Sequence, residues 1–311
     1  MLWIVFALLL WTCLPAFAAT APEDEAKYKA DLDEGISILK QGDRDDISRA
    51  IAKFKNALKI KPESAEAYYW IALAYSDQGN YPRAVGNAKD ATVYGEDIPE
   101  AWLLWGQILL YQRDWNAALE KLEIAQRLAP DNPQIQFNLG RVHYHGFKNP
   151  DAALPKFRAV WQKSQALRHE NPELQSMVVR SRLYMGYCEF ERKRWDNAIN
   201  AFLDVLKEQP DNYDASLMLA IAYRHTNRSG ESKRILDALL ANLMNLNNPA
   251  YNQLLSEVNL QLADLYIKDP IHRNRMFALA HLNEFINRLG TSSHPMLESV
   301  REYIAIHDSD E

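Results

Sequence analysis

The chain repeats a pattern of 34 residues, and residues 99–132 hold its clearest copy. Apolar and small side chains recur there at steps of three and four, which is the spacing of two amphipathic helices. The marked residues are Trp102, Trp105, Gly106 and Leu109 in the first helix, Ala118, Leu122 and Ala125 in the second, and Pro130 after it. Gly106 and Ala118 have almost no side chain, so we expect the two helices to touch backbone to backbone there. Pro130 helps to end the second helix.

The same offsets recur in other parts of the chain. Residues 65–98 carry Tyr68, Ile71, Ala72, Tyr75, Ala84 and Ala91, and residues 183–210 carry Gly186, Ala198, Phe202 and Pro210. An aromatic residue precedes the second helix in three copies, at Tyr81, Trp115 and Trp195. This period and pattern resemble the tetratricopeptide repeat (TPR) family over most of the chain after residue 25. The resemblance implies an all-α fold, a right-handed α-solenoid of about seven helix pairs over residues 27–290. A C-terminal capping helix and an acidic tail would follow over residues 291–311.

Some repeats depart from the regular period. The fourth has one extra residue before Ala153, and its second helix is expected to run on through residues 161–168 and to end at 169–172. A neutral and a functional insertion are both open readings of this segment. The fifth repeat is expected to begin at residue 179 and the sixth to end in an Asn-rich connection over 242–252. Gly290 is the expected end of the seventh, and residues 295–307 the expected capping helix, with Met296, Val300 and Ile304 on one face.

The N-terminus differs from the repeats. Residues 2–19 carry no charge, and Ala16-Phe17-Ala18 is a small-x-small cleavage pattern that follows Pro15. These features predict a secretory signal peptide over residues 1–18, a linker over 19–26, and a location in the periplasm or envelope of a bacterium. An uncleaved membrane anchor remains an alternative, because the apolar run is long and no Lys or Arg precedes it. Lipidation of Cys13 is less favoured, since Trp11 and Thr12 are a poor context for it.

Composition and missing motifs exclude several classes of function. A net charge of −6 and a pI near 5.8 provide no electrostatic basis for binding nucleic acid or an anionic membrane surface. The sequence contains no Gly-rich phosphate loop, His-Glu-x-x-His, Cys-x-x-Cys or Gly-x-Ser-x-Gly motif. His143 and His145, two residues apart on a helix, point to different faces. We therefore predict no enzyme, no catalytic residue, no metal and no cofactor. Cys188 is expected to pack as a small buried hydrophobe.

The candidate site comes from the resemblance. In TPR proteins the first helix of each repeat lines a concave groove, and transfer by position predicts the partner-binding residues. These are Tyr69, Leu73, Leu103, Gln107, Leu110, Phe137, Arg141, Tyr144, Leu183, Tyr187, Phe190, Ile221 and Arg224. The set is apolar and aromatic and lacks the Lys and Asn that grip a peptide carboxylate in a related class of these repeats. It predicts a protein or peptide partner with an apolar or amphipathic segment. Packing within the array is the alternative for any one residue, and Arg141 and Arg224 could equally form ordinary ion pairs.

Three function classes follow. The first is a non-catalytic interaction scaffold of the cell envelope that supports a pilus, secretion or cell-wall machine. The second is a self-assembling structural repeat protein, which would be a homo-oligomer. The third, an enzyme or ligand-binding protein, has the least support, because no convergent acid, base and nucleophile set is visible. In each class the chain would touch a membrane only through an uncleaved N-terminus.

Overall fold

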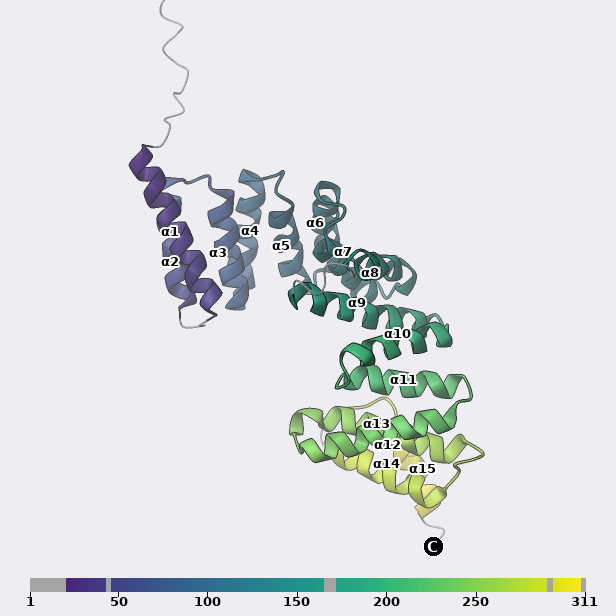
Figure 1. The fold of residues 1–311 in the computed structure, drawn as a ribbon. Helices are drawn as coiled ribbons and strands as arrows, with labels where there is room; N and C mark the ends of the chain where they lie inside the picture. The colour runs from purple at the N-terminus through teal and green to yellow at the C-terminus, as the bar shows by residue number, and fades with distance from the viewer. Residues whose placement is uncertain (1–20, 43–45, 165–171, 290–292, 309–311) are drawn as a thin grey trace, which may run out of the picture. The chain divides into compact units, whose positions relative to one another are not determined.

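The computed structural model describes residues 21–42, 46–164, 172–289 and 293–308. Within these ranges the chain is all-helical, with 15 α-helices, one π-helix, one 3-10 turn and no strand. Seven antiparallel pairs follow one another along the chain, from α1 with α2 to α13 with α14, and α15 packs on α14 (Figure 1). The predicted all-α fold of about seven pairs with a final capping helix is confirmed. The chain divides into two compact units, residues 1–129 and 130–311.

The first unit contains three helix pairs. Their bounds are α1 Pro22–Gln41, α2 Ile47–Ile60, α3 Ala65–Asp77, α4 Tyr81–Tyr94, α5 Pro99–Tyr111 and α6 Trp115–Leu128. Short polar side chains begin several of these helices. Ser64 Oγ accepts the Ala67 N–H at 3.1 Å, and Asp114 Oδ1 accepts the Ala117 N–H at 3.1 Å. These bonds satisfy donors that have no partner inside the helix, so they fix where each helix starts.

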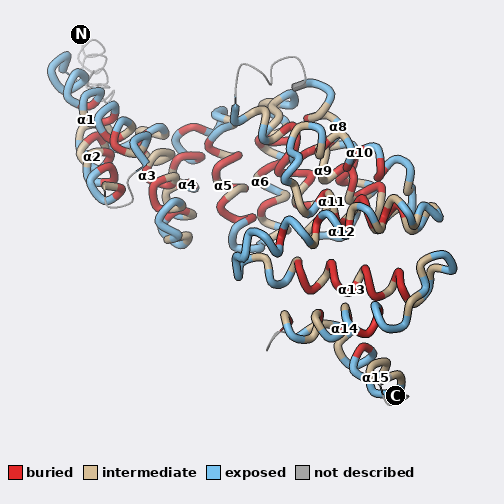
Figure 2. The backbone as a smooth tube through the Cα atoms, turned by 60° about the horizontal axis from the view of Figure 1, so that its bottom comes forward, coloured by how far each residue is buried: buried red, intermediate tan, exposed pale blue. Residues whose placement is uncertain are grey.

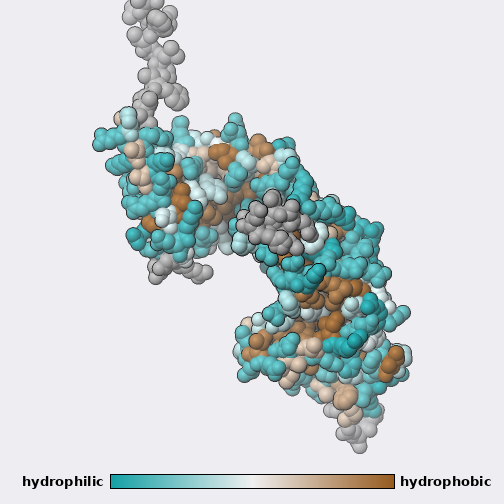
Figure 3. All heavy atoms as spheres, in the orientation of Figure 1, coloured by the Kyte–Doolittle hydropathy of each residue, from teal (hydrophilic) through white to brown (hydrophobic). Residues whose placement is uncertain are grey.

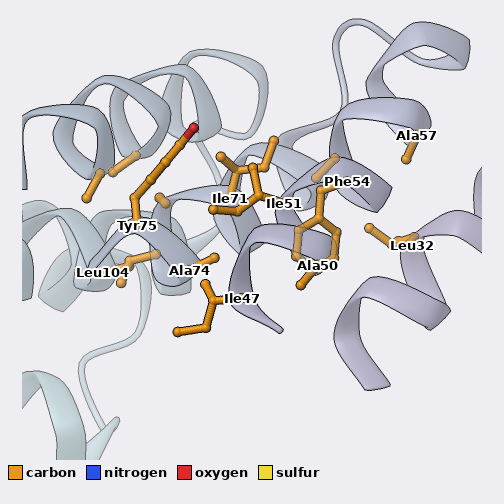
Figure 4. Packing of buried hydrophobic residues seen from close by; sticks show 14 of the residues in the cluster. Leu32, Ile47, Ala50, Ile51, Phe54, Ala57, Ile71, Ala74, Tyr75 and Leu104 are labelled. Carbon is orange, nitrogen blue, oxygen red and sulfur yellow. The ribbon is translucent and has the colours of Figure 1, made fainter. Parts of the chain in front are cut away.

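Buried residues (red in Figure 2) follow the sides of the helices that face their neighbours, and polar residues cover much of the visible surface in Figure 3. In the first unit, Phe54, Ile71 and Ile108 lie in one continuous core, part of which is drawn in Figure 4. A Cβ atom on Gly106 would lie 2.6 Å from Leu122 Cγ and 3.5 Å from the Ala118 carbonyl oxygen. The close approach predicted at Gly106 therefore exists, but the nearest atoms belong to the Leu122 side chain rather than to backbone.

The second unit contains the other four pairs and the capping helix. Its elements are α7 Pro133–Arg141, the π-helix η1 Val142–Gly146, α8 Pro150–Ser164, α9 Pro172–Glu191, α10 Trp195–Glu208, α11 Tyr213–His225, α12 Ser229–Leu246, the 3-10 turn η2 Pro249–Tyr251, α13 Asn252–Lys268, α14 Arg275–Leu289 and α15 Leu297–Asp308. The π-helix accounts for the one-residue insertion in the fourth repeat. In it the Phe147 N–H donates to the Val142 carbonyl, five residues earlier, at 3.2 Å.

The first helix of the fifth pair begins earlier than the repeat pattern predicts. Helix α9 begins at Pro172, seven residues before the predicted start of the fifth repeat at 179. Proline suits the first turn of a helix, where its missing N–H costs no bond, so Pro172 starts a helix rather than ending one. Val178, in this added stretch, is fully buried. The expected continuation of α8 over residues 165–168 lies outside the described residues.

Two predicted connections also prove helical. Helix α12 extends through Asn242 to Leu246 because Leu236, Leu239 and Leu243 continue its buried face, and it ends at Asn247 with φ of 44°. The stretch 242–252 is thus a connection only from Asn247 to Tyr251. At the N-terminus, α1 includes residues 22–26 of the predicted linker. Pro22 in its first turn and the acidic residues 23–25 favour a helix start there.

Helix α15 covers the end of the array. Val300 is buried among residues of α13 and α14, and Ile304 packs against the same cluster. Met296 precedes the helix and is exposed, so the predicted apolar face is correct for two of its three residues. Among the described helices, none is both long and apolar enough to cross a membrane. The predicted signal peptide, Gly290 and residues 309–311 lie outside the described residues.

Candidate partner-binding face

The predicted binding residues lie on first helices: α3 and α5 in the first unit, and α7 with η1, α9 and α11 in the second. We call their side of each unit the first-helix face. Ten of the thirteen are partly exposed. These are Tyr69, Leu73, Gln107, Arg141, Tyr144, Leu183, Tyr187, Phe190, Ile221 and Arg224. The other three, Leu103, Leu110 and Phe137, are only 4%, 3% and 5% exposed. These three serve the core, and their assignment as contact residues is corrected here.

In the first unit the partly exposed residues form a small apolar surface. Tyr69 and Leu73 pack against the core of α1–α5. The ring of Tyr69 meets Trp70 edge-on, with centroids 5.3 Å apart. Burial, with a smaller contribution from the nearby carboxylate of Glu100, raises the pKa of Tyr69. The Tyr69 hydroxyl therefore stays protonated and neutral.

In the second unit, Phe137 is buried by residues of α8 and α9. Phe137 contacts Phe157 and Tyr184 edge-on, with ring centroids 5.7 Å and 5.9 Å away. The guanidinium of Arg180 lies over the Phe137 ring at 5.0 Å, and Met177 packs against the same cluster. Met177 belongs to the turns that α9 has before residue 179, whereas Arg180 lies within the regular repeat. Position in a regular repeat could not indicate the packing of Met177, because those turns are absent from a regular repeat.

A cluster of tyrosines joins η1 to α9. Tyr144 stacks on Tyr187 at 6.3 Å, and its hydroxyl donates to Glu191 Oε1 at 2.6 Å. Burial first, and the Glu191 carboxylate second, raise the pKa of Tyr144 well above its usual range. The next residue, His145, places Nε2 2.9 Å from the Tyr184 hydroxyl, and burial lowers its pKa. The π-helix thus presents two consecutive rings to α9, a contact that no regular repeat predicts.

A second ring cluster lies between α9, α10 and α11. Trp195 stacks on His225 with centroids 4.1 Å apart, and Phe190 meets both rings edge-on. Leu183, Tyr187 and Phe190 pack against the core that these three helices share. His225 was not predicted as part of the site. It follows Arg224 directly at the end of α11. Its stacking partner Trp195 occupies the aromatic position at the start of the second helix, and that position is the signal that could have indicated His225.

The arginines make ordinary ion pairs and polar bonds. Arg224 is ion-paired with Asp264 and donates to Gln261 Oε1 at 2.7 Å, while Lys268 Nζ lies 2.6 Å from the other Asp264 oxygen. Arg141 donates to Asn138 Oδ1 at 3.2 Å. For Arg224, the ion-pair alternative is therefore the correct one. When the same positional transfer is applied to the seventh pair, it predicts Asp264, which occupies the position equivalent to Leu73 and Ile221.

The side chains of this face are of the kinds that make contacts with another protein. Within the ranges that the structure describes, no three His, Cys, Asp or Glu side chains are arranged to hold a metal ion. Cys188 is buried, and burial raises the pKa of its thiol to about 12, so it is protonated and unreactive at neutral pH. Rings, aliphatic side chains and paired charges remain, and these are the groups that protein interfaces use.

Seven consecutive helix pairs with small residues at the points of closest approach define a helical-repeat protein. Family models described as tetratricopeptide or TPR repeats match residues 43–79, 103–166 and 189–258, which together are more than half of the chain. The chain belongs to the tetratricopeptide repeat family. This is a family of protein-interaction scaffolds whose members are typically non-catalytic.

Two curated relatives are subunits of multiprotein complexes. The chain is 21% identical to bovine BBSome complex member BBS4 over 80% of this chain and 44% of that protein. It is 25% identical to anaphase-promoting complex subunit 3 of Schizosaccharomyces pombe over 46% of this chain and 21% of that protein. The matches thus span less than half the length of either relative. The solved structure of PilW, a type IV pilus biogenesis factor, shares the fold with a TM-score of 0.58 and 16% identity, over 76% of this chain and 98% of that chain.

Proposed function

We propose that this protein is an exported scaffold of a bacterial envelope, which holds an apolar or amphipathic segment of a partner protein against the first-helix face of its second unit. One observation carries the proposal. Leu183, Tyr187 and Phe190 on α9 stay partly exposed although they pack against the core of α9, α10 and α11, and Ile221 on α11 stays partly exposed although it packs against the core of α11 to α14. Side chains of this kind are already ordered before binding, so a partner buries their remaining apolar surface without paying much conformational entropy.

The setting in an envelope rests on the N-terminus and on fold. The uncharged run over residues 2–19 ends in Ala16-Phe17-Ala18, the pattern of a cleaved signal peptide. PilW, which shares this fold, is a pilus biogenesis factor. Assembly of a pilus, secretion or cell-wall machine is the class of process that we propose. Expression with its own N-terminus in a bacterium should yield an exported protein that starts at Ala19. A chain that keeps residue 1 would favour the membrane-anchor alternative.

Affinity capture from a bacterial envelope extract tests the binding face. We expect the double variant Tyr144→Ala, Tyr187→Ala to lose a partner that the natural chain retains. Leu203→Ala is the matched control, because Leu203 is an exposed apolar residue on the second helix α10. Circular dichroism and thermal melting must show that all three proteins stay folded. Equal capture by the double variant would contradict the assignment to this face.

Self-association is the second candidate, and a different surface favours it. The connection between α13 and α14 and the first turn of α14 expose Ile271, Met276 and Phe277, which are 85%, 61% and 55% exposed. Adjacent exposed apolar residues of this size are typical of contact surfaces. Sedimentation at increasing protein concentration distinguishes the candidates. A rise in mass that is abolished by Ile271→Ser with Phe277→Ser would support self-assembly, and a constant monomer mass would exclude it.

A further inference from the structure

A cavity of about 620 Å³ opens in the second unit between the start of α11, the start of α13 and the end of α14. Leu217, Leu254 and Leu289 supply apolar lining. Tyr213 and Tyr251 stand beside it, with their rings edge-to-face and centroids 5.5 Å apart. The predicted binding residues do not include this cavity.

Three carboxylates line the cavity: Asp211, Asp214 and Glu257. Asp211 and Asp214 are exposed, and in the described part of the chain no basic side chain pairs with either. Glu257 Oε1 accepts a bond from Gln261 Nε2 at 2.8 Å, and its other oxygen lies 3.5 Å from His294 Nε2. No Lys or Arg lines the cavity.

His294 is the one basic ring among the lining residues. Its Nδ1 accepts the backbone N–H of Met296 at 3.1 Å, and its Nε2 faces Glu257. The cavity therefore combines three carboxylates with one imidazole, two tyrosine rings and an apolar floor. That combination is complementary to a Lys or Arg side chain, whose head pairs with carboxylates and whose stem packs on rings.

The cavity is continuous with the proposed binding face. Asp214, Leu217, Ile221 and Arg224 follow one another on α11 at steps of three, four and three, so they share one side of the helix. The charge of Asp214 also acts on Tyr187 of α9: burial chiefly, and Asp214 next, raise the pKa of that tyrosine above its usual range. A segment that contacts Tyr187 and Ile221 would reach the cavity by continuing along α11.

We infer that this cavity receives a Lys or Arg side chain of the partner segment, beside the apolar contacts of α9 and α11. The inference rests on the proposed function and narrows the partner to an amphipathic segment that carries a cationic residue. Charge complementarity selects this occupant over a wholly apolar one. A cation in the cavity would also fix the direction of the partner segment along the face, because the tyrosine cluster of η1 and α9 lies on only one side of the cavity.

The test uses the full mature chain labelled with fluorotyrosine and observed by ¹⁹F NMR, with the signals assigned by Tyr213→Phe and Tyr251→Phe. The probe is N-acetyl-lysine N-methylamide, and the matched probe is the norleucine analogue, which lacks the amine. We expect saturable shifts of the Tyr213 and Tyr251 signals with the lysine probe and none with norleucine. Equal shifts with both probes would overturn the inference, and so would an equal response to magnesium chloride at the same ionic strength, which would assign the cavity to an inorganic cation.

Charge-neutralising variants locate the effect. Asp214→Asn with Glu257→Gln should weaken the lysine response by about threefold or more, since each removes one charge of a partly solvated pair. Asp196→Asn with Glu298→Gln removes the same charge from α10 and α15 and should leave the response unchanged. Equal weakening by both pairs would mean that only net charge matters, and would overturn the inference.

The two proposals fail separately. Loss of the lysine response with partner capture intact would reject the cavity and keep the binding face. If the double variant Tyr144→Ala, Tyr187→Ala still captures the partner and still responds to the lysine probe, the binding face is rejected and the cavity is kept as a cation site.

Discussion

At the scale of single residues, glycine in a first helix lets a large side chain of the second helix lie against its backbone. A Cβ atom on Gly186 would lie 2.5 Å from Cε1 and 2.8 Å from Cδ1 of Phe202, a ring that is completely buried. The ring cannot move without disturbing the core shared by α9, α10 and α11. The sequence pattern marked Gly186 and Phe202 correctly, because the need for a small residue opposite a large one is local to each pair.

We expect Gly186→Ala to lower the free energy of unfolding by about 1–3 kcal/mol through overpacking. Gly86→Ala is the matched control. Gly86 is also inside a helix, but no atom lies within 4 Å of its ideal Cβ position, so alanine there should stabilise by up to about 1 kcal/mol. Urea unfolding followed by circular dichroism measures both. Equal destabilisation by the two substitutions would show that the Phe202 contact is not the cause.

Acid should weaken the second unit through His281. Burial lowers the pKa of this ring from its ordinary 6.5, and Nδ1 lies 2.8 Å from Asn259 Oδ1. Asp237 and Glu284 raise that pKa and Lys233 lowers it. The folded protein thus prefers neutral His281, so the stabilisation is complete above about pH 6.5 and is lost as the pH falls below that value. Urea unfolding at about pH 7.5 and about pH 5.5 should show a larger loss for the natural chain than for His281→Gln.

Residues of the first-helix face show that the repeat pattern does not determine whether a side chain is exposed or buried. Leu183 and Leu103 occupy equivalent positions in their repeats, yet Leu183 is partly exposed and Leu103 is 4% exposed. A repeat pattern assigns each residue to a side of its helix, and that much holds for both. Whether a residue on that side is covered depends on the neighbouring helices, whose lengths vary along the chain. Met177, in the added turns of α9, is an example, because it packs against the cluster that contains Phe137.

At the scale of elements, helix existence was predictable and helix length was not. Steps of three and four located both helices of every pair. The repeat pattern predicts neither the early start of α9 at Pro172 nor the extension of α12 to Leu246, because it treats proline and asparagine as helix breakers. Proline can also start a helix, and asparagine can lie within one, when buried apolar residues continue the helix face. Val178 does so after Pro172, and Leu243 does so after Asn242.

The added turns of α9 can be tested by Ser176→Pro. Ser176 is exposed, so the substitution removes no core contact, but proline at this depth in a helix removes a backbone bond and costs about 3 kcal/mol. We expect amide exchange to accelerate over residues 173–179 and Met177 to lose its packing against the cluster that contains Phe137. Ser176→Ala should leave exchange slow. Unchanged exchange in the proline variant would mean that these turns contribute no local stability.

At the scale of the whole molecule, consecutive helix pairs contact each other within each unit, so destabilisation should spread from the altered pair and fade with distance. Gly186→Ala provides the test by hydrogen exchange with mass spectrometry. Peptides from residues 181–223 should lose protection, while peptides from residues 46–94 in the first unit should keep theirs. Uniform loss along the chain would instead indicate a single cooperative unit.

The π-helix η1 has a consequence for how a partner is aligned. Equivalent pairs offer a bound segment several similar binding sites, so a segment shifted by one pair would make almost the same contacts. The extra residue between Gly140 and Ala153 breaks that equivalence in the fourth pair, where Tyr144 and His145 project together toward α9. A partner that contacts this turn is therefore fixed in register along the array.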